Sequence, residues 1–197
     1  MIDALVAFTP VIDASTVREK LGVKDYYLLT FHRPVNVDNK ENLTVLVDII
    51  AQMAQQKQVV FPIHPRTKKR IAEFGLSDKL NNPNIVITDP IGYIDFIHLV
   101  KNAATVITDS GGVQEETTFM GVPCLTVRPN TERPVTITEG TNTLVELNAA
   151  TILALLQQIQ QGTYKKGKVP TFWDGRASER IVNEVVAFFD KQQAATA

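Results

Sequence analysis

The chain has 197 residues, of which 44% are hydrophobic and 21% are charged, and its formal net charge is −1. This apolar content is enough to bury a full core, so the composition excludes a disordered chain. The near-zero charge lacks the basic excess typical of nucleic-acid-binding proteins, and we expect no nucleic-acid partner. The single cysteine, Cys124, excludes an intrachain disulfide and a cysteine-rich zinc site, and it fits a reducing compartment.

The first residues and the hydropathy pattern indicate where the protein works. The chain begins MIDA, which is not the basic start of a secretory signal. No run approaches the ~20 apolar residues that a membrane-spanning helix needs. We therefore expect a cytoplasmic protein with no membrane partner.

Short β-branched runs alternate with amphipathic stretches along the chain, and no internal repeat or Gly/Ser linker interrupts them. In chain order, the predicted elements are a helix at 14–21, a strand at 26–31, a helix at 39–56, a strand at 59–63, a helix at 67–74, a strand at 85–88, a helix at 93–102, a strand at 105–108, a helix from 111 to about 121, strands at 122–127 and 144–147, and helices at 149–161 and 178–191.

This alternation of strands and helices predicts a parallel sheet with right-handed crossovers. The strand runs are continuously apolar, as expected for strands that are buried on both faces. The fold class is therefore α/β, a doubly wound parallel (Rossmann-like) sheet, and residues 1–197 form a single domain.

Polar side chains follow the carboxyl ends of the predicted strands, whereas the amino ends are plainer. In an open parallel sheet these carboxyl ends share one rim, and ligands bind in the crevice there. The polar residues at this rim are His32 and Arg33, His64 and Arg66, Asp89, Asp109 and Ser110, and Arg128, Glu132 and Arg133.

The segment DSGGVQEE at residues 109–116 leads from a strand through two glycines into a helix. Glycines let backbone N–H groups approach a ligand closely, and a helix N-terminus carries about half a positive charge. Ser110, Gly111 and Gly112 therefore predict a phosphate or diphosphate site. Glu115 and Glu116 fall in the first turn of the helix, where one of them could accept hydrogen bonds from a ribose diol. The alternative interpretation is a tight turn whose glutamates only oppose the helix dipole.

The histidines and arginines of the rim have two interpretations as well. His32 and His64 are each followed within two residues by an arginine, which favours ligand contact over a histidine merely packed at a strand end. Arg133 is either a phosphate ligand or half of a surface ion pair. His98 lies within a predicted helix and is interpreted as structural. The sequence contains no HxH or CxxC spacing and no GxGxxG, so we expect neither a zinc site nor an NAD cofactor.

Four segments, TFHRPVNVD at 30–38, PIHPR at 62–66, DSGGVQEE at 109–116 and RPNTERP at 128–134, occur in this order. Together they resemble the C-terminal half of the non-hydrolysing UDP-N-acetylglucosamine 2-epimerases. The resemblance implies one half of a GT-B fold, with UDP or a UDP-N-acetylhexosamine bound in the cleft between two domains. It implies that Ser110, Gly111 and Gly112 contact the diphosphate and Glu116 the ribose. It also implies that His32 is needed for activity and that Arg33 and His64 line the cleft.

The family interconverts UDP-GlcNAc and UDP-ManNAc without a cofactor by eliminating UDP and adding it back, in the service of cell-envelope polysaccharide synthesis. The resemblance implies that the acid and base carboxylates lie in an N-terminal domain outside this chain. Two positions depart from the family pattern, because Val35 and Val135 replace glutamates. We therefore expect the isolated chain to bind a uridine nucleotide weakly and not to epimerise, with an N-terminal domain or a second copy as partner. A non-catalytic nucleotide-sugar-binding module and a GT-B glycosyltransferase domain stay open as alternatives.

Overall fold

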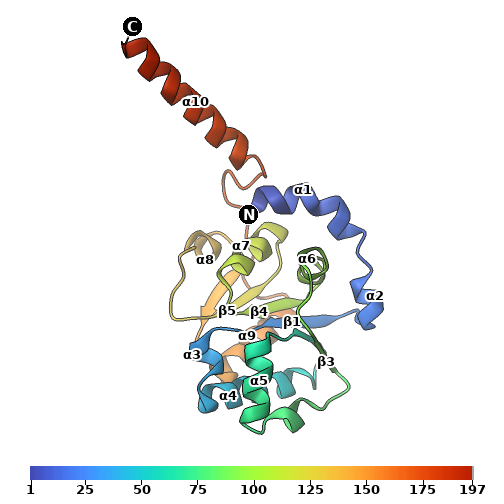
Figure 1. The fold of residues 1–197 in the computed structure, drawn as a ribbon. Helices are drawn as coiled ribbons and strands as arrows, with labels where there is room; N and C mark the ends of the chain where they lie inside the picture. The colour runs from blue at the N-terminus through green and yellow to red at the C-terminus, as the bar shows by residue number, and fades with distance from the viewer. Residues whose placement is uncertain (197) are drawn as a thin grey trace.

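The computed structural model describes the backbone of residues 1–196 and the side chains of residues 1–192. Six parallel strands form one sheet in the order β3-β2-β1-β4-β5-β6. This confirms the doubly wound α/β fold (Figure 1). The strands are β1 (Tyr26–Thr30), β2 (Gln58–Pro62), β3 (Ile85–Thr88), β4 (Thr105–Thr108), β5 (Cys124–Val127) and β6 (Asn142–Val145).

Helices cover both faces of the sheet, with α1, α6 and α7 on one side and α4, α5 and α9 on the other (Figure 1). The helices are α1 (Ile2–Asp13), α2 (Val17–Leu21), α3 (Pro34–Val37), α4 (Lys40–Met53), α5 (Pro65–Glu73), α6 (Tyr93–Lys101), α7 (Gly111–Met120), α8 (Val135–Thr138), α9 (Ala149–Gln160) and α10 (Ala177–Thr196), with a 3-10 turn at Ser77–Leu80.

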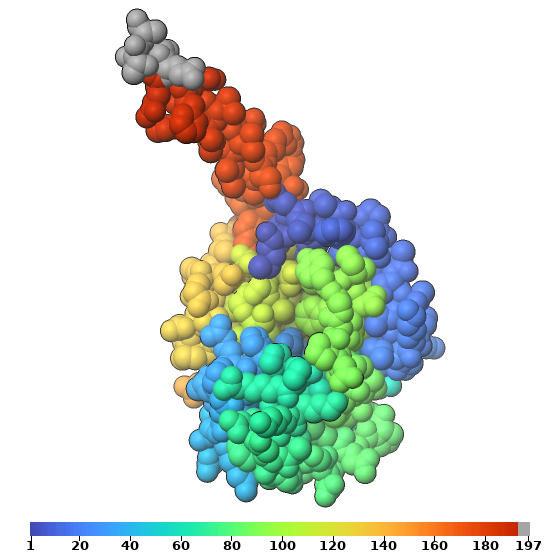
Figure 2. Space-filling view, in the orientation of Figure 1, coloured from blue at the N-terminus to red at the C-terminus, as the bar shows by residue number. Residues whose placement is uncertain are grey.

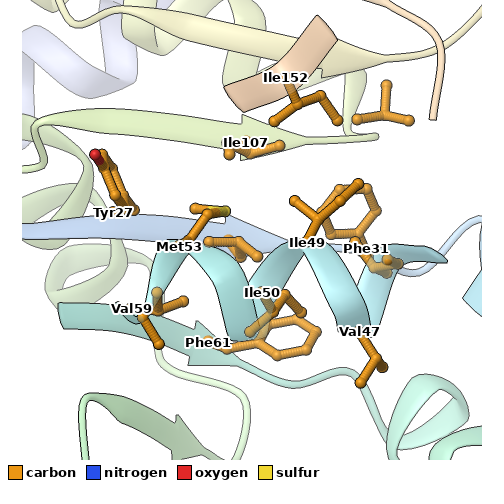
Figure 3. Close-up of a cluster of buried hydrophobic side chains, with 14 of the residues drawn as sticks. Tyr27, Phe31, Val47, Ile49, Ile50, Met53, Val59, Phe61, Ile107 and Ile152 are labelled. Carbon is orange, nitrogen blue, oxygen red and sulfur yellow. The ribbon is translucent and has the colours of Figure 1, made fainter. Parts of the chain in front are cut away.

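Strand β1 shows why the sheet forms from this sequence. Successive side chains of a strand point to opposite faces, so an apolar run serves two cores. Tyr27 and Leu29 enter the core beneath α4 and α9, whereas Tyr26 and Leu28 enter the core beneath α6 and α7. Figure 3 shows the first core, where Met53 and its neighbours on α4 face the strands. Strand β1 is therefore buried on both faces, and its carboxyl end lies at the rim that carries His32 and Arg33.

The structure differs from the predicted elements at several places, among them the short helices α3 and α8, which were not predicted. Helix α1 was not predicted; it contains Pro10, and only Leu5 and Ile12 of its interior turns are fully buried, so its amphipathic pattern is weak. Strand β6 begins two residues earlier than predicted because Asn142 pairs with Cys124 in the sheet. Asn142 is a fully buried polar residue, which hydropathy alone assigns to a loop.

Helix α10 extends away from the body of the protein and begins close to the N-terminus (Figures 1 and 2). The carboxylate of Asp3 accepts hydrogen bonds from the backbone N–H of Ala177 (3.2 Å) and of Ser178 (2.8 Å), which fixes the start of α10 on α1. The predicted apolar side of α10 is exposed along its length. Among the described residues, no helix is both long and apolar enough to cross a membrane.

Candidate functional site at the carboxyl rim of the sheet

His32 and His64 follow the neighbouring strands β1 and β2, and their ring centroids lie 5.9 Å apart. Both rings border a cavity of about 150 Å³ at the rim. The other residues that line this cavity are Thr30, Pro62, Pro90, Ile91 and Phe96. The rim thus combines two titratable rings with an apolar wall, as expected of a site for a small organic ligand.

Asp109 follows β4 and is completely buried beside His32. Its Oδ1 lies 3.0 Å from Nδ1 of His32, and its carboxylate also accepts from the backbone N–H of Arg33 (2.9 Å) and from Nδ2 of Asn36 (3.1 Å). Burial raises the pKa of Asp109, but these hydrogen bonds outweigh it and leave the pKa lowered. The hydrogen bond to Asp109 raises the pKa of His32 above its ordinary value. The pair therefore favours a charged imidazole at the rim.

Helix α7 begins at the paired glycines, with Ser110 in an extended conformation before it. A Cβ atom on Gly111 would lie 2.8 Å from Nη1 of Arg133, so glycine permits the close approach of this guanidinium to the helix start. A Cβ atom on Gly112 would meet only the tip of the Met1 side chain, at 3.0 Å. Both glycines are partly exposed, so the start of α7 lies at the surface rather than inside the core.

Two arginines from the segment after β5 lie beside this helix start. Arg128, which is buried, donates to both carboxylate oxygens of Glu132 (2.7 and 3.0 Å). Its hydrogen bonds lower the pKa of Glu132 to about 2. Nε of Arg133 lies 2.9 Å from Glu115. Arg133 is thus an ion-pair residue, as one interpretation predicted, and the same side chain sits over Gly111, where an anion would bind.

Glu116 lies one turn into α7 and is almost fully buried. Burial raises its pKa to about 7, against a lowering effect of the hydrogen bond from Tyr93. Partial desolvation, together with the charge of Glu116, raises the pKa of Tyr93 to about 12. A buried carboxyl group whose pKa is raised toward neutrality is a candidate functional group.

Gln114 is a buried residue of this region whose role the sequence did not reveal. Its Oε1 accepts from Thr131 Oγ1 (2.6 Å) and from Asn142 Nδ2 (3.1 Å), and its Nε2 donates to the carbonyl of Ser110 (3.1 Å). It therefore joins the start of α7 to the arginine-bearing segment. Its place inside DSGGVQEE was the only sequence signal available.

The remaining predicted residues have clear positions. Nδ1 of His64 accepts from the backbone N–H of Arg66 and caps α5 (3.2 Å), so His64 has both a structural contact and an exposed ring. The guanidinium of Arg66 pairs with Asp38, which turns it toward α3. His98 is buried, and its Nδ1 contacts the carbonyl of Ile12 at 2.7 Å, in agreement with a structural role.

The two valines that depart from the family pattern lie near the rim. Val35, in α3, is exposed, and its carbonyl accepts from Nδ2 of Asn42 at 2.8 Å. Val135 begins α8, directly after the arginine-bearing segment. Within the described part of the chain, no group of three or more His, Cys, Asp or Glu side chains is arranged to hold a metal ion.

Comparison with known proteins finds relatives that match most of this chain. The family profile described as UDP-N-acetylglucosamine 2-epimerase matches residues 1–186. The UDP-N-acetylglucosamine 2-epimerase of Methanocaldococcus jannaschii is 48% identical over 161 residues, which cover 80% of this chain and 43% of that protein. The enzyme of the same name from Bacillus subtilis is 34% identical over 178 residues, covering 86% of this chain and 46% of its own.

Solved structures place the fold in the same family. The crystal structure of the M. jannaschii UDP-GlcNAc 2-epimerase in complex with UDP-GlcNAc and UDP superposes with a TM-score of 0.80 at 41% identity. The match covers 94% of this chain and 52% of that one. The structure of the Rickettsia bellii UDP-N-acetylglucosamine 2-epimerase superposes with a TM-score of 0.79 at 27% identity, covering 95% and 51%.

The chain therefore spans about half the length of the relatives that it matches. The family profile covers nearly all of its residues. Contacts join the motifs that first indicated the resemblance: His32 lies beside His64 and Asp109, and Gly111 lies beside Arg133. This chain belongs to the UDP-N-acetylglucosamine 2-epimerase family.

Proposed function

We propose that this chain is the UDP-binding half of a UDP-N-acetylglucosamine 2-epimerase, an isomerase that converts UDP-GlcNAc to UDP-ManNAc. The observation that carries the proposal is the start of α7, where Gly111 lies beneath Arg133 and close to Arg128. Exposed N–H groups at a helix start and two guanidinium groups suit a doubly charged diphosphate. The relative from M. jannaschii, whose structure holds UDP-GlcNAc and UDP, supports the same ligand.

Each predicted site residue has a role in this proposal. The backbone of Ser110, Gly111 and Gly112 binds the diphosphate, and Arg33 and Arg133 neutralise its charge. The carboxylate of Glu116 accepts hydrogen bonds from the ribose hydroxyls. His32 faces the reacting end of the diphosphate. His64 completes the wall of the crevice. Substrate binding by Arg66 requires its guanidinium to leave Asp38 and turn toward the crevice.

In the proposed reaction, a base removes the proton at C2 of the sugar while the C1–O bond breaks and UDP leaves with the electron pair. The resulting glycal takes UDP back at C1 and a proton on the opposite face of C2, which inverts that centre. The protonated imidazole of His32 and the N–H groups of α7 stabilise the charge that develops on the leaving diphosphate. The chain supplies the leaving-group site, and we assign the C2 acid and base to residues outside it.

An N-terminal domain is the partner that completes the proposed enzyme. The relatives are about twice as long as the matched segment. Helix α10 exposes an apolar side that nothing in the described structure covers, which a partner domain would bury. The side chains of this apolar face are Ile181, Val182, Val185, Val186 and Phe189. A homodimer through the same face is the alternative, and sedimentation of the isolated chain distinguishes the two.

We further propose that the protein works in the cytoplasm. Cys124 is free and completely buried, which suits a reducing compartment. Fractionation of the native cells, with the protein detected by antibody, tests this assignment.

Calorimetric titration of the chain with UDP, GDP and ADP tests the ligand. We expect UDP to bind, and we expect Gly111→Ala to weaken binding at least tenfold. Asp48→Asn, which changes an exposed ion pair with Lys79 on α4, serves as the control and keeps full affinity. If none of the three nucleotides binds at millimolar concentration, the rim is not a nucleotide site.

Deuterium exchange tests the reaction. The N-terminal half of the M. jannaschii relative is mixed with this chain in D₂O and UDP-GlcNAc is added. We expect deuterium at C2 and formation of UDP-ManNAc only when both halves are present. Nucleotide binding without exchange would favour the non-catalytic binding module, and sugar transfer to an acceptor would favour a glycosyltransferase.

A further inference from the structure

Asp109 lies where two neighbouring strands end, and it joins their rim segments. It follows β4, whose partner β1 leads into His32 and Arg33. Its carboxylate accepts from the backbone N–H of His32 (3.1 Å) and of Arg33 (2.9 Å). Its backbone carbonyl accepts from Nε of Arg33 at 2.8 Å. The next residue, Ser110, begins the approach to α7, so Asp109 links two cationic side chains to the helix start.

The contact with the imidazole ring has a chemical consequence. An ionised carboxylate only accepts hydrogen bonds, so Nδ1 of His32 must carry a proton to bond with Oδ1 of Asp109 at 3.0 Å. Nε2 is then the ring nitrogen left for a ligand. The His32 side chain is 43% exposed and Asp109 is fully buried. The carboxylate therefore contacts the ring from the protein interior, and the other edge of the ring is open to the crevice.

The groups around this pair come from three segments. Asn36 in α3 donates to Asp109, His64 after β2 lies beside the His32 ring, and Arg33 follows His32. Arg33 opposes protonation of His32, whereas Asp109 favours it. A buried carboxylate therefore sets the balance between tautomers and charge states of the imidazole.

We propose that Asp109 is the positioning residue of this site: it fixes the proton on Nδ1 of His32 and holds His32 and Arg33 against the start of α7. This inference deepens the proposed function, because the ligand of Nε2 would be the leaving diphosphate. The competing interpretation is that Asp109 only ties two loops together through their backbone N–H groups. Replacing Asp109 by asparagine distinguishes the two interpretations, because the amide oxygen still accepts hydrogen bonds from the backbone N–H groups.

The test is nitrogen-15 NMR of the histidine rings, which needs no ligand. The chain has only three histidines, so the ring signals can be assigned by substitution. In the native protein we expect His32 to show the Nδ1–H tautomer above its pKa, and that pKa to lie above the ordinary value. In Asp109→Asn, the new amide N–H₂ donates to Nδ1, so we expect the Nε2–H tautomer and a lower pKa. Asp48→Asn serves as the matched control, and its His32 signals should not change.

Two results would overturn the proposal. One is an unchanged tautomer and pKa of His32 in a folded Asp109→Asn protein. The other is the Nε2–H tautomer in the native protein, which decides the question even when the variant does not fold. A second measurement is the affinity for UDP-GlcNAc as a function of pH. Asp109→Asn should weaken binding at least tenfold at pH 7. The loss of affinity that the native protein shows at high pH should begin at lower pH in this variant. Absence of nucleotide binding by the native protein would remove the proposed function, while the NMR result would still decide the role of Asp109.

Discussion

Tyr93, at the start of α6, and Glu116, one turn into α7, lie close enough for each side chain to shift the pKa of the other. The contact joins two helices on the same face of the sheet. Burial raises the pKa of Glu116 to about 7, and the hydrogen bond from Tyr93 limits that rise. Small changes around Glu116 therefore change its charge at physiological pH.

The first prediction concerns the pH dependence of UDP-GlcNAc binding. An ionised Glu116 accepts hydrogen bonds from the ribose better than a neutral one, so affinity should increase with pH along a limb centred near pH 7. In Tyr93→Phe the donor is lost, the pKa of Glu116 rises, and this limb should move to higher pH. Calorimetry between pH 5.5 and 9 measures the shift. A limb that stays in place in Tyr93→Phe would show that Glu116 does not control binding.

The second prediction concerns stability. The pKa of Glu116 is higher in the folded protein than in the unfolded chain, so the folded state loses stability as pH rises from about 4.5 through about 7. Glu116→Gln removes this loss. We expect Glu116→Gln to raise the free energy of unfolding by about 1–3 kcal/mol more at pH 8 than at pH 4.5. The same substitution should weaken nucleotide binding. Urea unfolding at the two pH values measures the difference, and an equal effect at both would contradict the assigned pKa.

The third prediction concerns Gly111→Ala. The added methyl group would lie 2.8 Å from Nη1 of Arg133, so the guanidinium must move away from the helix start. Gly111 has no positive φ, and alanine favours a helix more than glycine does. We therefore expect the free energy of unfolding to change by less than about 1 kcal/mol, while the affinity for UDP falls at least tenfold. A large loss of stability would instead show that the glycine serves packing.

The fourth prediction concerns α10. Val182 and Val186 are exposed, so replacing both by serine should change the free energy of unfolding of the isolated chain by less than about 0.5 kcal/mol. The same change should weaken association with the N-terminal half of a relative at least tenfold, because that half would bury the apolar face. The matched control replaces the exposed polar residues Asn183 and Asp190 by serine. Equal effects of the two double variants on association would argue against docking through this face.

The fold was largely predictable because strands such as β1 are buried on both faces, which leaves a continuous apolar run in the sequence. Helix α1 was not predictable, since it is recognised only when Leu5 and Ile12 meet Ile97 in the folded protein. The start of β6 was missed because Asn142 is satisfied by Thr126 and Gln114, which are distant in sequence.

The site was predictable where its chemistry is local. His32, His64 and Arg133 follow strands of the parallel sheet, and the carboxyl ends of parallel strands share one rim, so the sequence predicted that they lie there. Contacts between segments were not predictable. These contacts depend on how helices and loops pack together. They include the approach of Tyr93 to Glu116, the three contacts of Gln114 and the pairing of Arg66 with Asp38.

The state of Cys124 determines how this protein can be observed in solution. The thiol is completely buried in β5, and burial raises its pKa to about 11, so very little thiolate exists at neutral pH. Maleimide reagents should therefore leave the native thiol unmodified. A fluorophore attached through Phe188→Cys on α10 would then be the only dye on the molecule, and its emission would report burial of that helix in real time.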